Sequence, residues 1–569
     1  MSIETGTRWW QALAAGLAHS VLVIASFAPF GLSAVILLSP LPLIWVGMRP
    51  AKRPGVVALW VWVGNLAWWL FEQQFIVGVT AVGFGPMVAL LASYEAVFVW
   101  LLIVVRRRWA WLPVCVAAPV LWIGLEFLRA EVVLTGYAML VTAHPLIDAG
   151  PVGGASRLAW LIGTYGVGLA VLVWAGGVGD VVWGRKRLWG SGAIAVFLIL
   201  SLGGLVVKAP AGGSRRARIA VVQTNVAQSN KIAWSVDEQL ADWASFVELT
   251  REAAGQGPDV IVWPETMFPG IALEDDAIAT ERAARLSWEL ASGERLATTY
   301  FYDALMALSR EVGVPMLVGA VGVEGLRFEE SGEGVRTRVD GRHNSVFLVD
   351  DGRVVGARYD KMELTPFGEV MPGISAWAWL ERQLMAIGAG GMSFDLEAGR
   401  RAVVFEIEGA DGPFGVATPI CFEATIGGQC RRLLRGGEGA RAGVMVNVTN
   451  DGWFGDFDAG RRHHLLSARW RCLELRTPMV RAANTGISAW INASGRVVEE
   501  LEPRTSGVLV ADVAVRQAPA PSGLIGLVIA WGCAGATIVA MAWGVGGWVR
   551  ARTWGRSATN NGSTGGQDE

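Results

Sequence analysis

The chain has 569 residues, of which 53% are hydrophobic and 17% charged, and its formal net charge is -2. That near-neutral balance argues against a nucleic-acid partner, and the length allows more than one domain. Residues 1–208 contain few charged side chains, whereas the middle of the chain has the composition of a soluble domain. The five cysteines show no CxxC spacing, which argues against a disulfide framework or a zinc site and leaves a reactive thiol open.

Eight apolar segments are long enough for membrane-spanning helices, since a span needs roughly 20 apolar residues. Seven lie in the N-terminal region 1–208, near 10–28, 32–48, 56–76, 80–105, 109–128, 158–183 and 189–207, and the eighth lies near 523–548. The first is interpreted as a retained helix because it lacks a clear basic start and further spans follow it. The polar tail 553–569, rich in Gly, Asn and Ser, is expected to be disordered.

Basic residues follow every second apolar segment. The clusters are Arg49, Lys52 and Arg53 after the second segment, Arg106–Arg108 after the fourth, Arg185–Arg187 after the sixth and Arg550–Arg556 after the eighth. Because short cytoplasmic loops carry the excess of Lys and Arg, both termini are predicted to lie in the cytoplasm. The domain between the seventh and eighth segments is then expected on the outer side of the membrane.

The loop after the fifth segment runs from Glu126 to Arg157. It contains an apolar run, Val132–Val141, that is too short to cross a membrane. Two interpretations remain open for this run: a re-entrant or interfacial segment, or an ordinary outer loop packed on the following domain.

Residues 217–515 alternate between strand-like and helix-like patterns, which is typical of an α/β sandwich. The turn Asp351-Gly352 predicts a hairpin between His343–Asp350 and Arg353–Arg358. The stretch Glu274–Ala297 reads as an inserted helical excursion. Further strands are expected at 218–223, 259–263, 315–323, 413–419, 443–449, 481–493 and 507–513, and helices at 236–254, 299–312, from about 423, and 461–476.

Three segments carry side chains suited to acyl chemistry. Glu265 ends a buried strand, where partial burial raises the pKa of a carboxyl and suits it to act as a general base. Lys361 follows the hairpin, where a fixed positive charge can stabilise an oxyanion, and Glu369 can pair with it. Cys421 lies where a strand meets a helix, and a helix N-terminus favours the nucleophilic thiolate. Taken singly, these residues have simpler interpretations: a capping glutamate, a solvated lysine and a small buried hydrophobe.

In the order Glu265, Lys361, Cys421, these segments resemble the nitrilase superfamily over about 217–515. With the apolar helices, the resemblance extends over nearly the whole chain to the apolipoprotein N-acyltransferase family. It implies an α-helical transmembrane bundle joined to an α/β nitrilase-like αββα sandwich. The further segments that carry it are VQTNVAQSNKIAW at 222–234, NDGWFG at 450–455, RCLELRTPMVR at 471–481, NTG at 484–486 and EFLRAEVVLTG at 126–136.

The resemblance implies a two-step acyl transfer without metal or cofactor. Cys421 would attack the ester of a phospholipid acyl donor while Glu265 takes the thiol proton. Lys361 and the amide of Phe422 would hold the oxyanion. The α-amine of a diacylglyceryl-modified apolipoprotein would then attack the thioester, in a ping-pong scheme.

Further residues enter through the same resemblance. Glu369, Phe422 and Glu423 are expected to support the triad, and Trp234 and Trp453 to contact substrate, although both tryptophans equally fit ordinary packing. The family usually has tyrosine where this chain has Phe422, so a hydroxyl contact is lost. A monomer in the bacterial cytoplasmic membrane is implied.

Two rival hypotheses remain at this stage. One is a membrane-anchored nitrilase-type amidase that hydrolyses a small amide, with water as the acceptor. The other is a non-catalytic transporter or scaffold with a degenerate domain.

Overall fold

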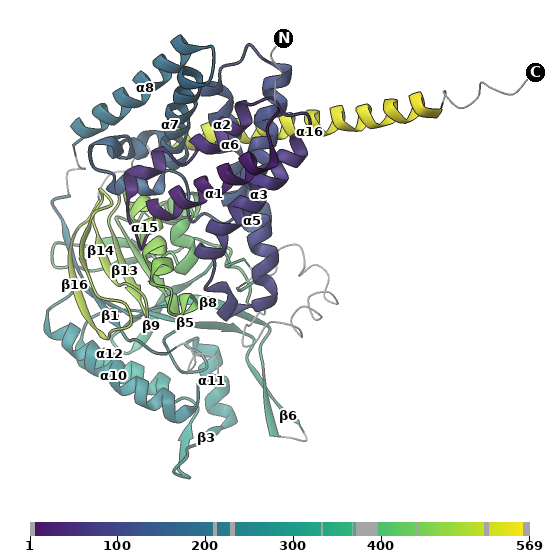
Figure 1. Cartoon of the computed structure of the whole chain (residues 1–569). Coiled ribbons are helices and arrows are strands. Elements are labelled where there is room, and N and C mark those ends of the chain that lie inside the picture. The colour runs from purple at the N-terminus through teal and green to yellow at the C-terminus, as the bar shows by residue number, and fades with distance from the viewer. Residues whose placement is uncertain are drawn as a thin grey trace, which may run out of the picture.

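A computed structural model describes residues 6–208, 213–227, 234–331, 334–366, 368–370, 396–437, 441–516 and 523–560. It consists of a helical part, formed by residues 6–208 and the C-terminal helix, and an α/β domain between them. Figure 1 shows the helical part lying along one side of the α/β domain, so that the two parts share a long boundary.

Helices form at all eight apolar segments. Among the described residues, six helices are long and apolar enough to cross a membrane. The helical elements are α1 (Trp9–Ser26), η1 (Ser33–Leu37), α2 (Leu41–Met48), α3 (Pro54–Glu72), α4 (Ile76–Val79), α5 (Ala81–Arg108), α6 (Val114–Phe127), α7 (Ala159–Val182), α8 (Arg187–Val206) and α16 (Leu524–Asn560).

Three expected boundaries were wrong. The second segment is split into η1 and α2, because Pro40 cannot donate the backbone hydrogen bond that would continue one helix. The fifth is the 14-residue α6, which begins only after Pro113. Helix α16 continues to Asn560, past the expected end of the eighth segment at 548. Residues 561–569 lie outside the described part of the chain.

The loop after α6 is irregular and mostly buried. Its backbone is held by two side chains of α6 and of the turn η2 (Leu128–Val132): Arg129 donates to the carbonyls of residues 137, 139 and 140 at 3.0–3.2 Å, and Glu126 accepts from the amide of Thr142 at 2.8 Å. On its other side, Trp470 donates to the carbonyl of His144 at 2.9 Å. The loop therefore packs on the α/β domain at His144, while Val132, Val133 and Leu134 at the start of its apolar run are exposed.

Two six-stranded sheets form the α/β domain. The first has the order β16-β1-β2-β5-β8-β9 and the second the order β10-β11-β12-β13-β14-β15. The first sheet comprises β1 (Arg216–Gln223), β2 (Val260–Val262), β5 (Met316–Glu324), β8 (Gly341–Asp350), β9 (Arg353–Asp360) and β16 (Gly507–Ala514). The second comprises β10 (Val404–Ile407), β11 (Phe414–Ala417), β12 (Val444–Thr449), β13 (Met479–Ala483), β14 (Ala489–Ile491) and β15 (Val497–Glu500).

Four layers result, and they confirm the expected αββα sandwich. Apolar residues of both sheets, such as Val262 and Val446, meet in one buried core. Helices α10 (Val236–Gly255) and α12 (Tyr300–Val312) cover the outer face of the first sheet. Helices α14 (Gly427–Arg435) and α15 (Asp458–Leu475) cover the second. Because Trp470 of α15 belongs to the core of the helical part, α15 also joins the two parts.

The excursion at 274–297 is only half helical. Helix α11 (Asp275–Ala284) ends at Arg285, whose left-handed φ of 52° stops it. A hairpin of β3 (Ser287–Glu289) and β4 (Arg295–Ala297) follows, so the expectation of a wholly helical insertion was wrong. The structure also has a second hairpin that the sequence did not predict, β6 (Arg327–Ser331) with β7 (Gly334–Arg338).

Candidate active site

The three expected triad residues come from strand ends of both sheets. Glu265 follows β2 and Lys361 follows β9, and these two strands run in the same direction, so their C-terminal ends lie at one edge of the sheet. Cys421 follows β11 of the second sheet and opens the short turn η6 (Cys421–Thr425). The chain thus brings the three residues together across the sandwich.

Glu265 is held by two hydrogen bonds and is only 6% exposed. Its Oε1 accepts from the side-chain amide of Asn344 at 2.6 Å, and its Oε2 accepts from the backbone amide of Asn450 at 2.7 Å. The ammonium of Lys361 lies 3.6 Å from Oε1. The carboxylate is therefore fixed in place while its nearest cation remains outside hydrogen-bond distance.

Lys361 is almost fully buried and pairs with Glu369. Its Nζ lies 2.7 Å from Glu369 Oε2 and donates to Thr365 Oγ1 at 3.2 Å. Burial by itself would lower the pKa of Lys361, but the carboxylates of Glu369 and Glu265 outweigh burial and raise it. The lysine therefore stays charged, as an oxyanion partner requires.

The environment of Cys421 raises the pKa of its thiol. Burial, followed by the charge of Glu265, raises this pKa, while Lys361 and a hydrogen bond with Thr449 act in the opposite direction. The sequence predicted a helix N-terminus at Cys421, but η6 is a 3-10 turn of five residues, so the cysteine does not lie at the N-terminus of a long helix. A protonated thiol needs a base before it can attack, and Glu265 is the carboxylate beside it.

Glu423 connects the lysine loop to the nucleophile turn. It is fully buried and accepts from the backbone amides of Ile420, Met362 and Glu363 at 2.8, 2.8 and 3.1 Å. The hydroxyl of Tyr359 also donates to it, at 2.8 Å. These contacts tie the segments on either side of the triad to one carboxylate.

The three other expected site residues lie in different surroundings. Phe422 is buried beside the nucleophile in η6. Trp453 is half-buried in the turn η7 (Asp451–Phe454), which directly follows Asn450. Trp234 packs against the core beneath α10, and its indole donates to Asp242 of that helix at 2.9 Å. These described contacts of Trp234 are with α10 rather than with the triad.

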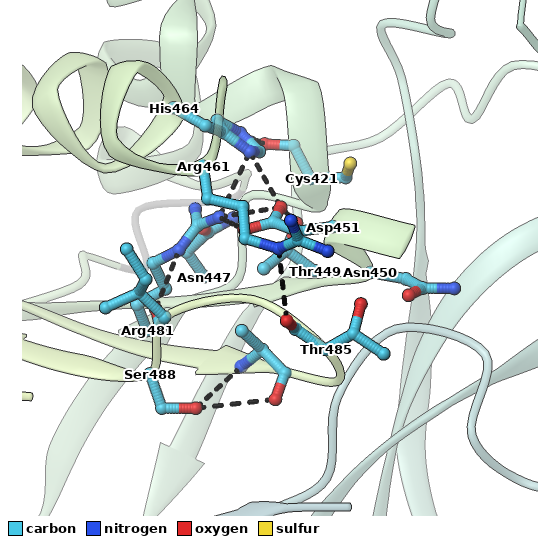
Figure 2. Close-up of polar contacts among 12 residues, drawn as sticks. Cys421, Asn447, Thr449, Asn450, Asp451, Arg461, His464, Arg481, Thr485 and Ser488 are labelled. Atoms are coloured by element: carbon cyan, nitrogen blue, oxygen red, sulfur yellow. Dashed lines mark hydrogen bonds and ion pairs between the residues drawn. The ribbon is translucent and has the colours of Figure 1, made fainter. Parts of the chain in front are cut away.

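Sequence reasoning missed a polar network around the nucleophile. It consists of Asp451, His464 and Arg481 (Figure 2). Asn450 and Asn344 extend it on the side of Glu265. One signal was present: Asn450 and Asp451 directly follow a buried strand, as Glu265 does. Arg481 of β13 ends the family segment 471–481, but nothing in the sequence connected it with the nucleophile. His464 gave no signal, because it lies inside helix α15.

Burial of Asp451 opposes its ionisation, but Arg481 and His464 outweigh it and hold its pKa well below the usual range. Asp451 is therefore a fixed negative charge next to the nucleophile turn. Among the described residues, no three His, Cys, Asp or Glu side chains group as a metal site would require.

Comparison with known families covers both parts of the chain. Residues 218–520 match the carbon-nitrogen hydrolase model, and residues 19–177 match the model of the apolipoprotein N-acyltransferase N-terminal domain. Among solved structures, an amidase from Nesterenkonia sp. aligns with 56% of this chain and 95% of its own, at 16% identity and a TM-score of 0.34.

Relatives similar over nearly the full length share one name. The apolipoprotein N-acyltransferase of Geobacter metallireducens is 28% identical, covering 91% of this chain and 93% of its own. Those of Sinorhizobium medicae and Brucella suis are each 30% identical, covering 87% and 88% of this chain and 88% and 89% of their own. The chain is therefore a membrane acyltransferase of the apolipoprotein N-acyltransferase family, within the nitrilase superfamily.

Proposed function

We propose that this chain transfers an acyl chain from a phospholipid to the α-amino group of the N-terminal diacylglyceryl-cysteine of apolipoproteins, the final step of lipoprotein maturation. The observation that carries this proposal is geometric: the thiol-bearing turn at Cys421 meets the carboxylate of Glu265 and the ammonium of Lys361, which lie 3.6 Å apart. The site belongs to a chain whose apolar helices bring it to a lipid phase, where both substrates reside.

The first half-reaction forms a thioester. Glu265 accepts the thiol proton as Cys421 Sγ attacks the ester carbonyl of the phospholipid. Lys361 and the amide of Phe422 stabilise the tetrahedral oxyanion. When this intermediate collapses, the ester C–O bond breaks, Glu265 returns the proton to the leaving oxygen, and a lysophospholipid departs.

The second half-reaction transfers the acyl group to nitrogen. The α-amine of the apolipoprotein attacks the thioester carbonyl, and Glu265 accepts a proton from that amine. The C–S bond then breaks, the proton returns to Cys421, and an amide is released. The same base serves both steps because each step moves one proton off the attacking atom and onto the leaving atom.

Supporting roles follow from the contacts. Glu369 keeps Lys361 charged, and Glu423 fixes the lysine loop against the nucleophile turn. We further propose that Trp453 and Trp234 contact substrate, a role that rests on the family resemblance rather than on these contacts.

The charge pattern of the loops supports an orientation in the bacterial inner membrane. Both termini lie in the cytoplasm, and the α/β domain lies on the outer, periplasmic face. We propose that the protein acts there as a monomer.

Labelling with a membrane-impermeant maleimide tests this orientation. Single cysteines are placed in the loop after α1 or in the loop after α5, in a variant that lacks the native cysteines. In intact spheroplasts, only the cysteine in the loop after α1 is expected to react with the maleimide. The reverse pattern would contradict the orientation.

Mass spectrometry of the purified protein mixed with phospholipid tests the function directly. An acyl adduct on Cys421, discharged on adding a diacylglyceryl-cysteine peptide, is expected. Cys421→Ala is the matched control and should form none. Ammonia release from small amides, without acylation of the peptide, would support the amidase hypothesis instead. The match at residues 19–177 favours the acyltransferase.

A further inference from the structure

The backbone of Cys421 is held in an unfavourable conformation. Its φ of 49° lies in the left-handed region, which side-chain-bearing residues rarely adopt. Such a conformation costs free energy and persists only where the surrounding contacts over-determine it. The direction in which the thiol points therefore depends on whatever holds the peptide groups on either side of Cys421.

Two side chains hold those peptide groups from the second sheet and its covering helix. Nε2 of His464, in α15, lies 3.2 Å from the carbonyl oxygen of Cys421. The side-chain amide of Asn447, in β12, donates to the carbonyl of Pro419 at 2.8 Å. The nucleophile is thus held both at its own carbonyl and two residues before it.

Both supports meet at one buried ion pair. The guanidinium of Arg481 donates to Asp451 at 2.7 and 2.9 Å and to Asn447 Oδ1 at 2.6 Å. Nδ1 of His464 lies 2.9 Å from Asp451 Oδ1. Arg481 and Asp451 are 0% and 1% exposed, so solvent does not compete for these contacts.

The same network also reaches the base. Asn450, directly before Asp451, donates its backbone amide to Glu265 at 2.7 Å. Figure 2 shows the sulfur of Cys421 directed away from His464, while its backbone faces the network. The network therefore lies behind the nucleophile and contacts its backbone carbonyl, and Asn450, next to Asp451 in the chain, contacts the carboxylate of Glu265.

We propose that His464 is a positioning residue for the nucleophile, oriented by the Asp451–Arg481 ion pair. It fixes the carbonyl of Cys421, and thereby the distance from the thiol to Glu265, without contacting substrate. This proposal deepens the proposed function and rests on it for the identity of the nucleophile. A displacement of about 1 Å in such a site lowers the rate by about 10²-fold.

Two variants of the full-length protein, His464→Gln and His464→Asn, distinguish the contributions of the two ring nitrogens of His464. His464→Gln keeps an N–H donor near the place of Nε2, within reach of the Cys421 carbonyl. His464→Asn keeps a polar group only near Nδ1, facing Asp451. We expect His464→Asn to lower kcat of acyl transfer by about tenfold or more with KM nearly unchanged, and His464→Gln to restore most of it.

The second readout does not depend on the acyl-transfer reaction. Cys421 is partly exposed whereas the other four cysteines are buried, so its alkylation by iodoacetamide can be followed alone by mass spectrometry. His464→Asn should slow this alkylation relative to His464→Gln at equal Tm. Equal alkylation and equal kcat in both variants and in the wild type would overturn the proposal.

If His464→Asn does not fold, Asn447→Asp takes its place. The carboxylate still accepts from Arg481 but no longer donates to the Pro419 carbonyl, and kcat and alkylation should both fall with KM nearly unchanged. Wild-type rates for both would contradict the proposal. A wild-type protein that forms no acyl adduct on Cys421 would refute the proposed function instead, and the alkylation comparison would still test the positioning role.

Discussion

Lys361 and Glu369 form a largely buried ion pair, with 2.7 Å between Nζ and Oε2. This pairing gives the lysine a permanent counterion other than Glu265, which lies farther away at 3.6 Å. In the proposed mechanism, Glu265 is therefore left to exchange a proton with the thiol, while Lys361 remains a fixed charge. Glu369, the nearer carboxylate, is thus the counterion of Lys361, whereas Glu265, the farther one, is assigned the role of base in the proposed mechanism.

Glu369→Gln should destabilise the protein and impair catalysis. Removing one partner of a buried ion pair typically costs about 3–5 kcal/mol, because the other charge is left uncompensated. The pKa of Glu369 is lowered in the fold, so its contribution is present above its ordinary value of 4.5 and is lost as the pH falls further. The pKa of Lys361 is raised, so its contribution is present below its ordinary value of 10.5.

Thermal unfolding at several pH values checks this prediction. The difference in Tm between wild type and Glu369→Gln should be largest between about pH 4.5 and 10.5 and should shrink in acid. A difference that does not change between neutral and acidic pH would contradict the ion-pair explanation.

Glu265→Gln and Lys361→Met should move the pKa of the Cys421 thiol in opposite directions. The charge of Glu265 raises this pKa, so its removal lowers the pKa; the charge of Lys361 lowers it, so its removal raises the pKa. The pH dependence of iodoacetamide alkylation measures both shifts. Glu265→Gln should still lose about 10²–10⁴-fold in acyl transfer, because the base is absent. Shifts in the same direction would contradict the electrostatic arrangement.

Cys421→Ala should abolish transfer without unfolding the protein. We expect turnover to fall by about 10⁴-fold or more, since no other group can carry the acyl chain. Cys430→Ala is the matched control, because Cys430 is fully buried in the core beneath α14. Cys430→Ala should lower Tm but should leave the acyl adduct on Cys421 unchanged. An adduct that persists in Cys421→Ala would place the nucleophile elsewhere.

Glu423→Gln should destabilise the site although it preserves shape. Both carboxylate oxygens accept from backbone amides, of Ile420 on one side and Met362 on the other. In glutamine, the NH₂ group replaces one of these oxygens and would face a backbone N–H donor, which would then have no acceptor. An unsatisfied buried donor costs about 1–3 kcal/mol. We expect a lower Tm together with slower acylation, both measured in detergent. A variant with wild-type Tm and rate would show that Glu423 does not connect the two segments.

Arg129→Lys should loosen the contact between the helical part and the α/β domain. Arg129 donates to three backbone carbonyls of the loop that packs under α15, and a lysine ammonium has a different geometry that does not match all three. Loss of hydrogen bonds from a charged donor predicts a destabilisation of about 1.5–3 kcal/mol. Limited proteolysis within 133–148 should accelerate. Unchanged cleavage would contradict this role of Arg129.

The sequence by itself determined the two-part organisation and predicted three reacting groups. Apolar length marked the helices, and alternation of strand and helix patterns marked the sandwich, because both signals are local. Glu265, Lys361 and Cys421 were recognisable because each follows a strand and together they match a family pattern. Local patterns did not give helix ends, so the division at Pro40 and the short α6 went unpredicted.

Only the tertiary structure decided the surroundings of the Cys421 thiol and the supports of its backbone. A strand-to-helix junction suggested a thiolate, but burial and the charge of Glu265 raise the pKa of the thiol, and Glu265 comes from the other sheet. Asp451, His464 and Arg481 come from a turn, a helix and a strand that are separated along the chain. Their meeting behind the nucleophile depends on how the second sheet packs against α15, which no local pattern encodes.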